Sequence, residues 1–94
     1  MRDEASSSAY VPRLPTGVRL HHDQVRQRWV LLAPERIIEL GAVELDILRA
    51  CDGSATVRDI AEQLAARYAA PSAEVEADVR EFIDALAARR IVDR

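Results

Sequence analysis

Residues that commonly build a catalytic or metal site are scarce in this chain of 94 residues. Cys51 is the only cysteine, so no disulfide can form within the chain, which fits a reducing compartment. His21 and His22 are the only histidines, and adjacent residues of a strand point to opposite faces. No cluster of further ligands with zinc-site spacing accompanies them. We therefore expect no bound metal, no organic cofactor and no enzymatic activity.

Lysine is absent, and all 13 basic residues are arginine. Long apolar runs are absent too, since none approaches the roughly 20 residues of a membrane-spanning helix, and the polar N-terminus lacks a signal-peptide core. We therefore expect a cytoplasmic protein with no membrane partner. The whole chain carries a net charge of −3, but residues 41–94, with seven arginines and eleven acidic residues, carry −4. This acidic half should repel the phosphate backbone of nucleic acids.

The beginning of the chain has the composition of a flexible tail. Residues 1–16 contain a serine run and two prolines, which oppose regular structure. The folded domain is therefore expected over residues 17–94. Alternating apolar and polar residues predict a first strand that opens at Gly17, with a turn at residues 22–24.

Two further strands are predicted around Pro34. Residues 27–32 read as the second strand, and Pro34 stops the pairing because it has no N–H to donate. Residues 36–40 then form a third, shorter strand, with Ile38 and Leu40 on one face and Ile37 and Glu39 on the other.

Helical spacing of apolar residues follows the third strand. A first stripe ends at Cys51, with Gly53 as the expected left-handed cap. Thr56 and Asp59 have the spacing of a helix-capping pair and predict the start of a second helix. A third helix is expected after Pro71. The predicted fold is α+β and winged-helix-like, with a three-stranded antiparallel sheet followed by a three-helix bundle, in the order β-β-β-α-α-α.

The third strand lies at an edge of the predicted sheet, and an exposed edge is a hazard unless it is covered or used. A plain edge blunted by the charges of Glu35, Arg36 and Glu39 is the reading that composition alone favours. A docking edge for an extended ligand is the alternative.

A winged helix that binds DNA has the same number of helices and a similar hairpin. Its recognition helix should be basic where it enters the major groove. The third predicted helix has five acidic residues before Arg89, so a DNA-binding regulator is the disfavoured alternative.

Short motifs along nearly the whole chain resemble the PqqD family of pyrroloquinoline quinone biosynthesis. Each motif alone is weak, but the ordered set is specific, and Gly41 is a mild departure that concerns only the start of the first helix. The matching residues are Pro12-Arg13-Leu14, Gly17-Val18-Arg19-Leu20, Asp23, Arg26, the WVLLAPE segment (29–35), Leu40, Ile47-Leu48, Cys51-Asp52-Gly53, Thr56-Val57, Ile60, Leu64 and the DVREFIDAL segment (78–86).

The resemblance implies a non-catalytic peptide chaperone, a recognition element for a ribosomally made and later modified peptide. Such proteins bind the precursor peptide PqqA and deliver it to the radical S-adenosylmethionine enzyme PqqE. The peptide is expected to add as a strand to the third strand and to lie against the third helix. The implied site residues are Glu35, Arg36, Ile37, Ile38, Glu39, Leu40, Val75, Asp78, Val79 and Phe82.

Several points stay open at the level of sequence. The affinity and stoichiometry of peptide binding are not given, and the N–H of Ile38 faces either the second strand or the peptide. The flank of the third helix that faces the peptide is either Asp78 with Arg89 or Glu76 with Arg80. The surface that contacts the radical enzyme is not assigned, and neither is the oligomeric state, for which a homodimer is one option.

Overall fold

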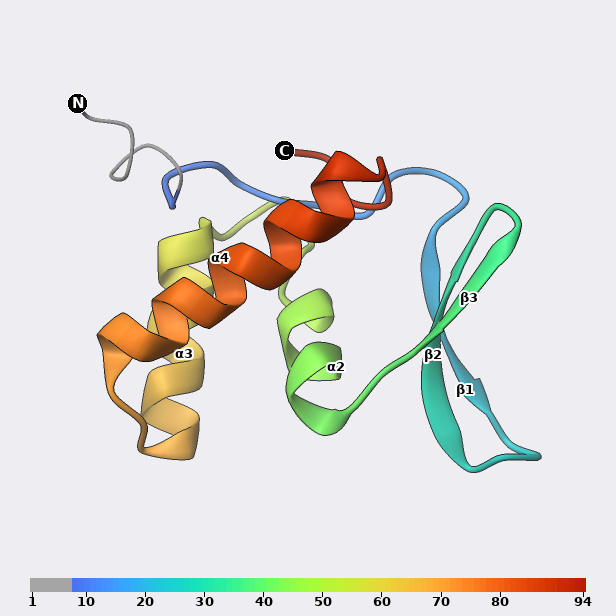
Figure 1. The fold of residues 1–94 in the computed structure, drawn as a ribbon, viewed down its shortest axis with the longest axis horizontal. Coiled ribbons are helices and arrows are strands. Elements are labelled where there is room, and N and C mark those ends of the chain that lie inside the picture. Colours follow the sequence, from blue (N-terminus) through green and yellow to red (C-terminus); the bar gives the residue numbers. More distant parts are fainter. Residues whose placement is uncertain (1–7) are drawn as a thin grey trace.

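The order of elements follows the predicted one. The structure, a computed structural model, describes residues 8–94. Its elements are the strands β1 (Arg19–Asp23), β2 (Arg28–Ala33) and β3 (Arg36–Glu39) and the helices α2 (Ala42–Arg49), α3 (Val57–Tyr68) and α4 (Ser72–Ala88). The sheet lies at one end of the molecule, α3 and α4 pack together at the other, and α2 lies between them (Figure 1). The expected α+β fold, with an antiparallel sheet ahead of three helices, is confirmed.

The three strands form an antiparallel sheet in the order β1-β2-β3, with β2 at its centre. Leu20, Leu31 and Ile38 are partners across the sheet and share its core-facing side. Leu31 is fully buried, and Ile38 packs against the same apolar cluster. Ile37 lies on the opposite face with 70% of its surface exposed. The predicted assignment of faces on the third strand is therefore confirmed.

The first hairpin differs from its prediction by the position of the turn. The turn was expected at residues 22–24, but His22 pairs with Trp29 and Asp23 pairs with Arg28, so β1 continues to Asp23. The His22 and Trp29 rings lie 5.1 Å apart. The Asp23 carboxylate accepts a hydrogen bond from the N–H of Arg26 at 3.2 Å, which is the usual role of aspartate at the first position of a turn. The contact between the two rings and the hydrogen bond to Asp23 together place the turn at residues 24–27.

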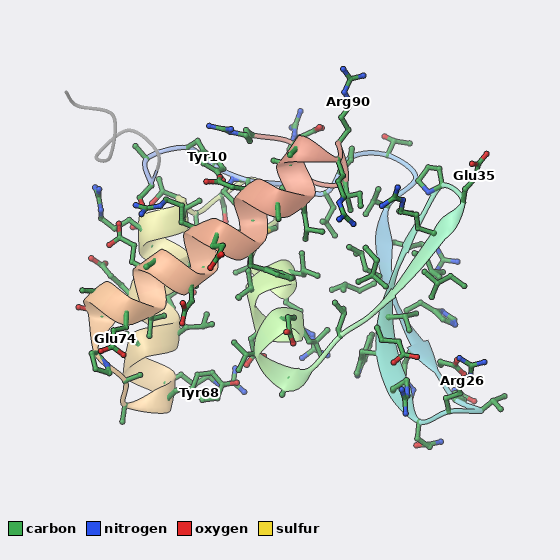
Figure 2. The ribbon with its side chains drawn as sticks, in the orientation of Figure 1. Tyr10, Arg26, Glu35, Tyr68, Glu74 and Arg90 are labelled. Carbon is green, nitrogen blue, oxygen red and sulfur yellow. The ribbon has the colours of Figure 1, made fainter. Side chains whose placement is uncertain are left out.

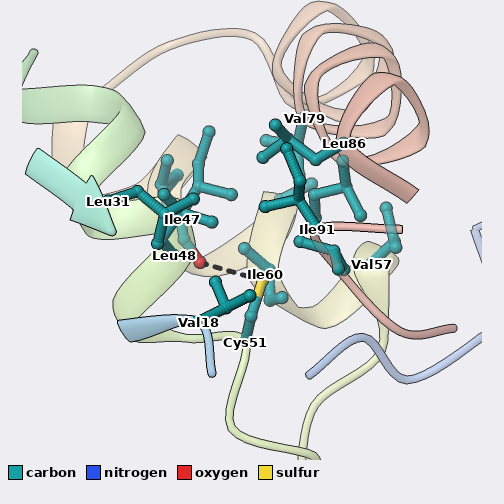
Figure 3. Packing of buried hydrophobic residues seen from close by; sticks show 14 residues of the cluster. Val18, Leu31, Ile47, Leu48, Cys51, Val57, Ile60, Val79, Leu86 and Ile91 are labelled. Atoms are coloured by element: carbon teal, nitrogen blue, oxygen red, sulfur yellow. Dashed lines mark hydrogen bonds between the residues drawn. The ribbon is translucent and has the colours of Figure 1, made fainter. Parts of the chain in front are cut away.

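One apolar cluster joins the sheet to all three helices. Leu31 from β2, Leu48 from α2, Ile60 from α3 and Val79 from α4 belong to it, and each is almost fully buried (Figure 3). Fully burying a side chain of this size stabilises a fold by about 1.5–3 kcal/mol. β3 pairs with β2, and α4 packs on α3, so the cluster that joins these elements fixes β3 relative to α4.

The two predicted helix caps had different outcomes. Thr56 and Asp59 cap α3 reciprocally, with both hydrogen bonds at 3.0–3.1 Å, as expected. The prediction that Gly53 caps the first helix is wrong. That helix, α2, ends at Arg49 with Ala50 as its cap, and Gly53, at φ +85°, lies in the following loop. Beyond that cap, Asp52 organises a separate turn, because its carboxylate accepts hydrogen bonds from the N–H and the hydroxyl of Ser54.

Residues 8–16, which we call the strap, pack on the helices, contrary to the predicted flexible tail. Ser8 and Pro12 are fully buried. The first N–H groups of a helix have no partner within it, and the strap supplies two acceptors. The N–H of Val57 donates to the carbonyl of Tyr10, and the N–H of Arg58 donates to the carbonyl of Ser8, both at 3.0 Å. Residues 1–7 of the predicted tail lie outside the described residues.

Candidate functional site

The outer side of β3 is an open sheet edge. β3 is an end strand, and its only strand partner in residues 8–94 is β2. The N–H of Leu40, the residue after β3, donates to the carbonyl of Trp29 at 3.1 Å. In an antiparallel pair, residues that bond across the pair alternate with residues that do not. The main-chain N–H and carbonyl groups of Arg36 and Ile38 therefore point towards β2.

The main-chain groups of Ile37 and Glu39 consequently point away from the sheet. They present two N–H donors and two carbonyl acceptors along one line, which is the pattern that an added strand requires. The side chain of Ile37 adds an exposed apolar surface at the same edge. The Glu39 carboxylate accepts a hydrogen bond from Arg28 at 2.7 Å and lies 3.9 Å from Arg26. These exposed ion pairs contribute little stability, but they reduce the charge at the edge.

The remaining strand residues of the predicted site have different environments. Glu35 lies in the tight β2–β3 turn at φ +62°, with its side chain directed away from the helices (Figure 2). Arg36 is exposed next to that turn, and its main chain pairs with Ala33. Leu40 packs against the apolar cluster together with Ile38, so these two side chains form the floor beside the edge.

The two flanks of α4 differ in their partners. Glu76 lies 3.9 Å from Arg58 on α3, and Arg80 donates to the Ser8 hydroxyl of the strap at 3.4 Å. That flank is therefore engaged with the strap and α3. Asp78 is exposed. These contacts favour the Asp78 flank as the one that is open to a ligand.

An apolar hollow of about 270 Å³ lies where the three helices meet. Val75, Asp78 and Val79 of the predicted site line it, whereas Phe82 does not. Val79 is only 1% exposed and forms part of the floor. The complete lining consists of Val43, Ile47, Leu64, Tyr68, Ala70, Val75, Asp78 and Val79. These eight residues define the apolar hollow.

Similarity to known proteins agrees with this geometry. The family model described as coenzyme PQQ synthesis protein D (PqqD) matches residues 28–92, which is more than half of the chain. The chain belongs to the PqqD family. A protein of Xanthomonas euvesicatoria pv. vesicatoria (strain 85-10) named "PqqA binding protein" is 46% identical over 81 residues, covering 86% of this chain and 88% of that protein. A protein of the same name from Xanthomonas oryzae pv. oryzae (strain KACC10331 / KXO85) is 44% identical with the same coverage.

Two solved structures of PqqD proteins share the fold. One is the solution NMR structure of the PqqD truncation of Methylobacterium extorquens PqqCD, described as a functional, stand-alone recognition element for ribosomally synthesized and post-translationally modified peptides. It is 42% identical, with 95% of this chain and 99% of that chain covered and a TM-score of 0.76. The other is the crystal structure of PqqD from Xanthomonas campestris. It is 41% identical, with 97% of this chain and 94% of that chain covered and a TM-score of 0.58.

Two groups of this PqqD-family chain, the buried Cys51 thiol and the half-buried Tyr10 hydroxyl, have raised pKa values. Burial raises the pKa of the Cys51 thiol to about 12, and the thiol donates to the carbonyl of Ile47 at 3.3 Å. Burial also raises the pKa of Tyr10, and the Asp84 carboxylate, 2.5 Å from its hydroxyl, adds to the effect. Both groups stay protonated at neutral pH. Residues 8–94 contain no group of three or more His, Cys, Asp or Glu side chains that could hold a metal ion.

Five residues that line the apolar hollow are not among the predicted site residues: Val43, Ile47, Leu64, Tyr68 and Ala70. The helical spacing of apolar residues places Val43 and Tyr68 on the apolar stripes of their helices, but the two side chains are 47% and 44% exposed. Ala70 lies in the α3–α4 connection, where helical periodicity gives no signal. The periodic pattern identifies the apolar side of a helix, but only the packing of the neighbouring helix ends shows which apolar residues stay open.

Proposed function

We propose that this chain is a non-catalytic peptide-binding protein of pyrroloquinoline quinone biosynthesis. It binds a PqqA-type precursor peptide as an added strand on β3 and presents that peptide to the radical S-adenosylmethionine enzyme PqqE. The observation that carries the proposal is the outward direction of the main-chain groups of Ile37 and Glu39. The names of the Xanthomonas relatives and the description of the Methylobacterium recognition element support it.

The energetics of strand addition indicate that more than the main chain must take part. Four main-chain hydrogen bonds contribute roughly 0.5–1.5 kcal/mol each, so about 2–6 kcal/mol together. A dissociation constant of about 1 μM requires about 8 kcal/mol, after the loss of translational and rotational freedom has been offset. Burial of apolar peptide side chains against Ile37, Ile38 and the Val75–Asp78 side of α4 supplies the difference in this proposal.

The proposed role needs no reaction on this protein itself. The protonated Cys51 thiol and Tyr10 hydroxyl provide no activated nucleophile, and we propose that neither a cofactor nor a metal takes part. Within residues 8–94, no helix is long and apolar enough to cross a membrane. The proposal places the protein in the cytoplasm, together with the peptide and the radical enzyme.

DNA binding by a winged helix is the competing function, and α4 disfavours it. This helix would enter the major groove, yet Arg80 is its only basic residue, against five acidic ones. A basic recognition surface provides most of the affinity of DNA-binding proteins. A gel-shift assay at moderate salt with mixed duplex DNA should show no retarded band, and a salt-sensitive complex would favour the regulator.

A titration with synthetic PqqA-type peptide tests the proposal. Isotope-labelled protein should show its largest amide shifts at residues 36–40, with smaller shifts around Val75 and Asp78. Shifts confined to the strap and the first turn of α3 would contradict docking on β3. Binding to PqqE is measured separately, by asking whether the saturated complex, rather than the free chain, is retained by immobilised enzyme.

A further inference from the structure

The apolar hollow has the size of a subsite for one side chain. Its volume of about 270 Å³ lies just below the roughly 300–1,000 Å³ of sites that enclose drug-sized ligands. Seven of its eight lining residues are apolar or aromatic, and Asp78 is the only one that carries a charge. Its chemistry therefore suits one large apolar side chain with a polar or charged neighbour.

The apolar hollow begins where β3 ends. Val43, on its rim, lies in the first turn of α2, three residues after Leu40. Figure 1 shows the chain passing directly from β3 into the start of α2. A strand rises about 3.3 Å per residue, so a peptide that pairs with Ile37 and Glu39 and continues past Glu39 reaches this region within a few residues. The open edge and the apolar hollow thus lie along one path.

Tyr68 forms a fixed wall of the apolar hollow. Its hydroxyl donates to the carboxylate of Asp46 on α2, and Arg67 lies 3.5 Å from the same carboxylate. This arrangement ties the last turn of α3 to α2 and holds the ring in place, although the side chain is partly exposed. A fixed aromatic wall favours binding because little side-chain freedom is lost when a ligand arrives.

One acidic side chain, that of Asp78, lies among the residues that line the apolar hollow. Asp78 forms no ion pair with any residue of 8–94. Glu74 lies one turn earlier on α4, and Figure 2 shows it at the same end of the helices as Tyr68. Arg67, whose guanidinium lies 5.8 Å from the centre of the Tyr68 ring, is paired with Asp46, so Asp78 is the one unpaired charge among the lining residues. An unpaired carboxylate beside an apolar floor complements an apolar residue that has a lysine or arginine close to it.

We propose that the apolar hollow is an anchoring subsite for the bound peptide. It accepts one large apolar side chain from the part of the peptide that runs past Glu39, and Asp78 pairs with a lysine or arginine next to that side chain. The inference rests on the proposed function, because the edge of β3 brings the peptide to the subsite. It adds the chemistry of the ligand segment and makes Tyr68 and Ala70 determinants of specificity.

A filling substitution tests the subsite. Ala70→Phe places a ring in the apolar hollow and should weaken binding of a synthetic PqqA peptide by ~10–100-fold, the range expected for excluding one large apolar side chain. Ala66→Phe, at an exposed position of α3 outside the apolar hollow, is the matched control and should bind like the unchanged chain. Both variants are checked by thermal unfolding, so that a loss of folding is not read as a loss of binding.

A charge exchange tests the role of Asp78 independently. Asp78→Lys should weaken peptide binding. Replacing one particular basic residue of the peptide by Glu should restore the affinity of the peptide for this variant, and it should weaken binding of the peptide to the unchanged chain. Unaltered affinity of Ala70→Phe, or no restoring exchange at any basic residue of the peptide, would overturn the subsite. If the β3 amides still shift in that case, the proposed function stands and only the subsite fails. If they do not shift with the unchanged chain either, the proposed function itself fails.

Discussion

The N–H of Leu40 donates to the carbonyl oxygen of Trp29 at 3.1 Å, and this contact sets the phase of the whole β2–β3 ladder. It places the N–H of Ile38 towards β2 and the N–H of Ile37 towards solvent. From the sequence alone, the direction of the Ile38 N–H could not be decided, because alternation of side chains says nothing about which main-chain pairs are bonded. Two neighbouring isoleucines thus have opposite roles.

Proline at these two positions should separate folding from binding. Ile38→Pro removes a ladder bond and should lower the unfolding free energy by ~1–3 kcal/mol, which shifts the thermal midpoint by several degrees in a domain of this size. Ile37→Pro removes only an outward donor, so the midpoint should change less and peptide affinity should fall ~3–10-fold. Thermal unfolding and calorimetric titration of both variants check this. An Ile37→Pro chain with unchanged peptide affinity would argue against strand addition.

Aspartate at the same positions tests the two faces of β3. Ile38 packs against the apolar cluster, so Ile38→Asp should destabilise the fold by ~2–3 kcal/mol through the burial of an unpaired charge. Ile37 is mostly exposed, so Ile37→Asp should unfold like the unchanged chain but bind peptide more weakly. The thermal midpoint and the peptide affinity are measured for both. Normal folding and normal binding in both would mean that β3 is not the docking edge.

The strap should be required for stability. Deleting residues 1–13 removes the two carbonyl acceptors of α3, the buried Pro12 and the Tyr10–Asp84 hydrogen bond. Loss of a helix cap alone costs about 0.5–2 kcal/mol, so the deletion should lower the midpoint by ten degrees or more, at ~4–8 degrees per kcal/mol. Val11→Ser, at an exposed strap residue, is the control. A truncated chain that melts like the full one would show that the strap contributes nothing.

Cys51 should be inert until the protein unfolds. Burial raises its pKa to about 12, so the folded state holds the proton more tightly than the unfolded state does. Its contribution to stability is therefore complete below the ordinary thiol pKa of about 8.5 and declines as pH rises from there towards 12. A thiol reagent at pH 8 should label Cys51 only in denaturant, and Cys51→Ala should reduce the loss of stability between pH 9 and 11. Rapid labelling under native conditions would contradict this burial.

The sequence was sufficient where a local signal agrees with the packing. Thr56 and Asp59 identify the start of α3 because a capping pair acts within one turn, and Pro34 marks the β2–β3 turn for the same reason. The prediction that Gly53 caps the first helix was wrong, because a glycine several residues past a helix looks the same in the sequence as a cap. In the structure, Asp52 forms a side-chain turn ahead of Gly53. The edge position of β3 was predicted correctly, since it follows from the order of the strands.

The packing of the strap and the position of the apolar hollow could not be predicted from short sequence patterns. Ser8 and Pro12 have loop-forming residue types, and both are held by residues more than forty positions away in the chain. The Ser8 carbonyl accepts from the N–H of Arg58, and the Pro12 carbonyl accepts from the N–H of Gly53. Val43, Tyr68 and Ala70 come together only because three helix ends meet. The choice between the two flanks of α4 likewise depends on Arg58 and Ser8, which occupy one of them.

Hydrogen exchange of individual β3 amides, with and without saturating PqqA-type peptide, tests strand addition most directly. In the free chain the Ile38 amide should be protected by β2, while the Ile37 and Glu39 amides should exchange rapidly because they face solvent. Bound peptide should slow exchange at Ile37 and Glu39 and leave the first turn of α3 unchanged. Peptide that binds without protecting these two amides would contradict the account.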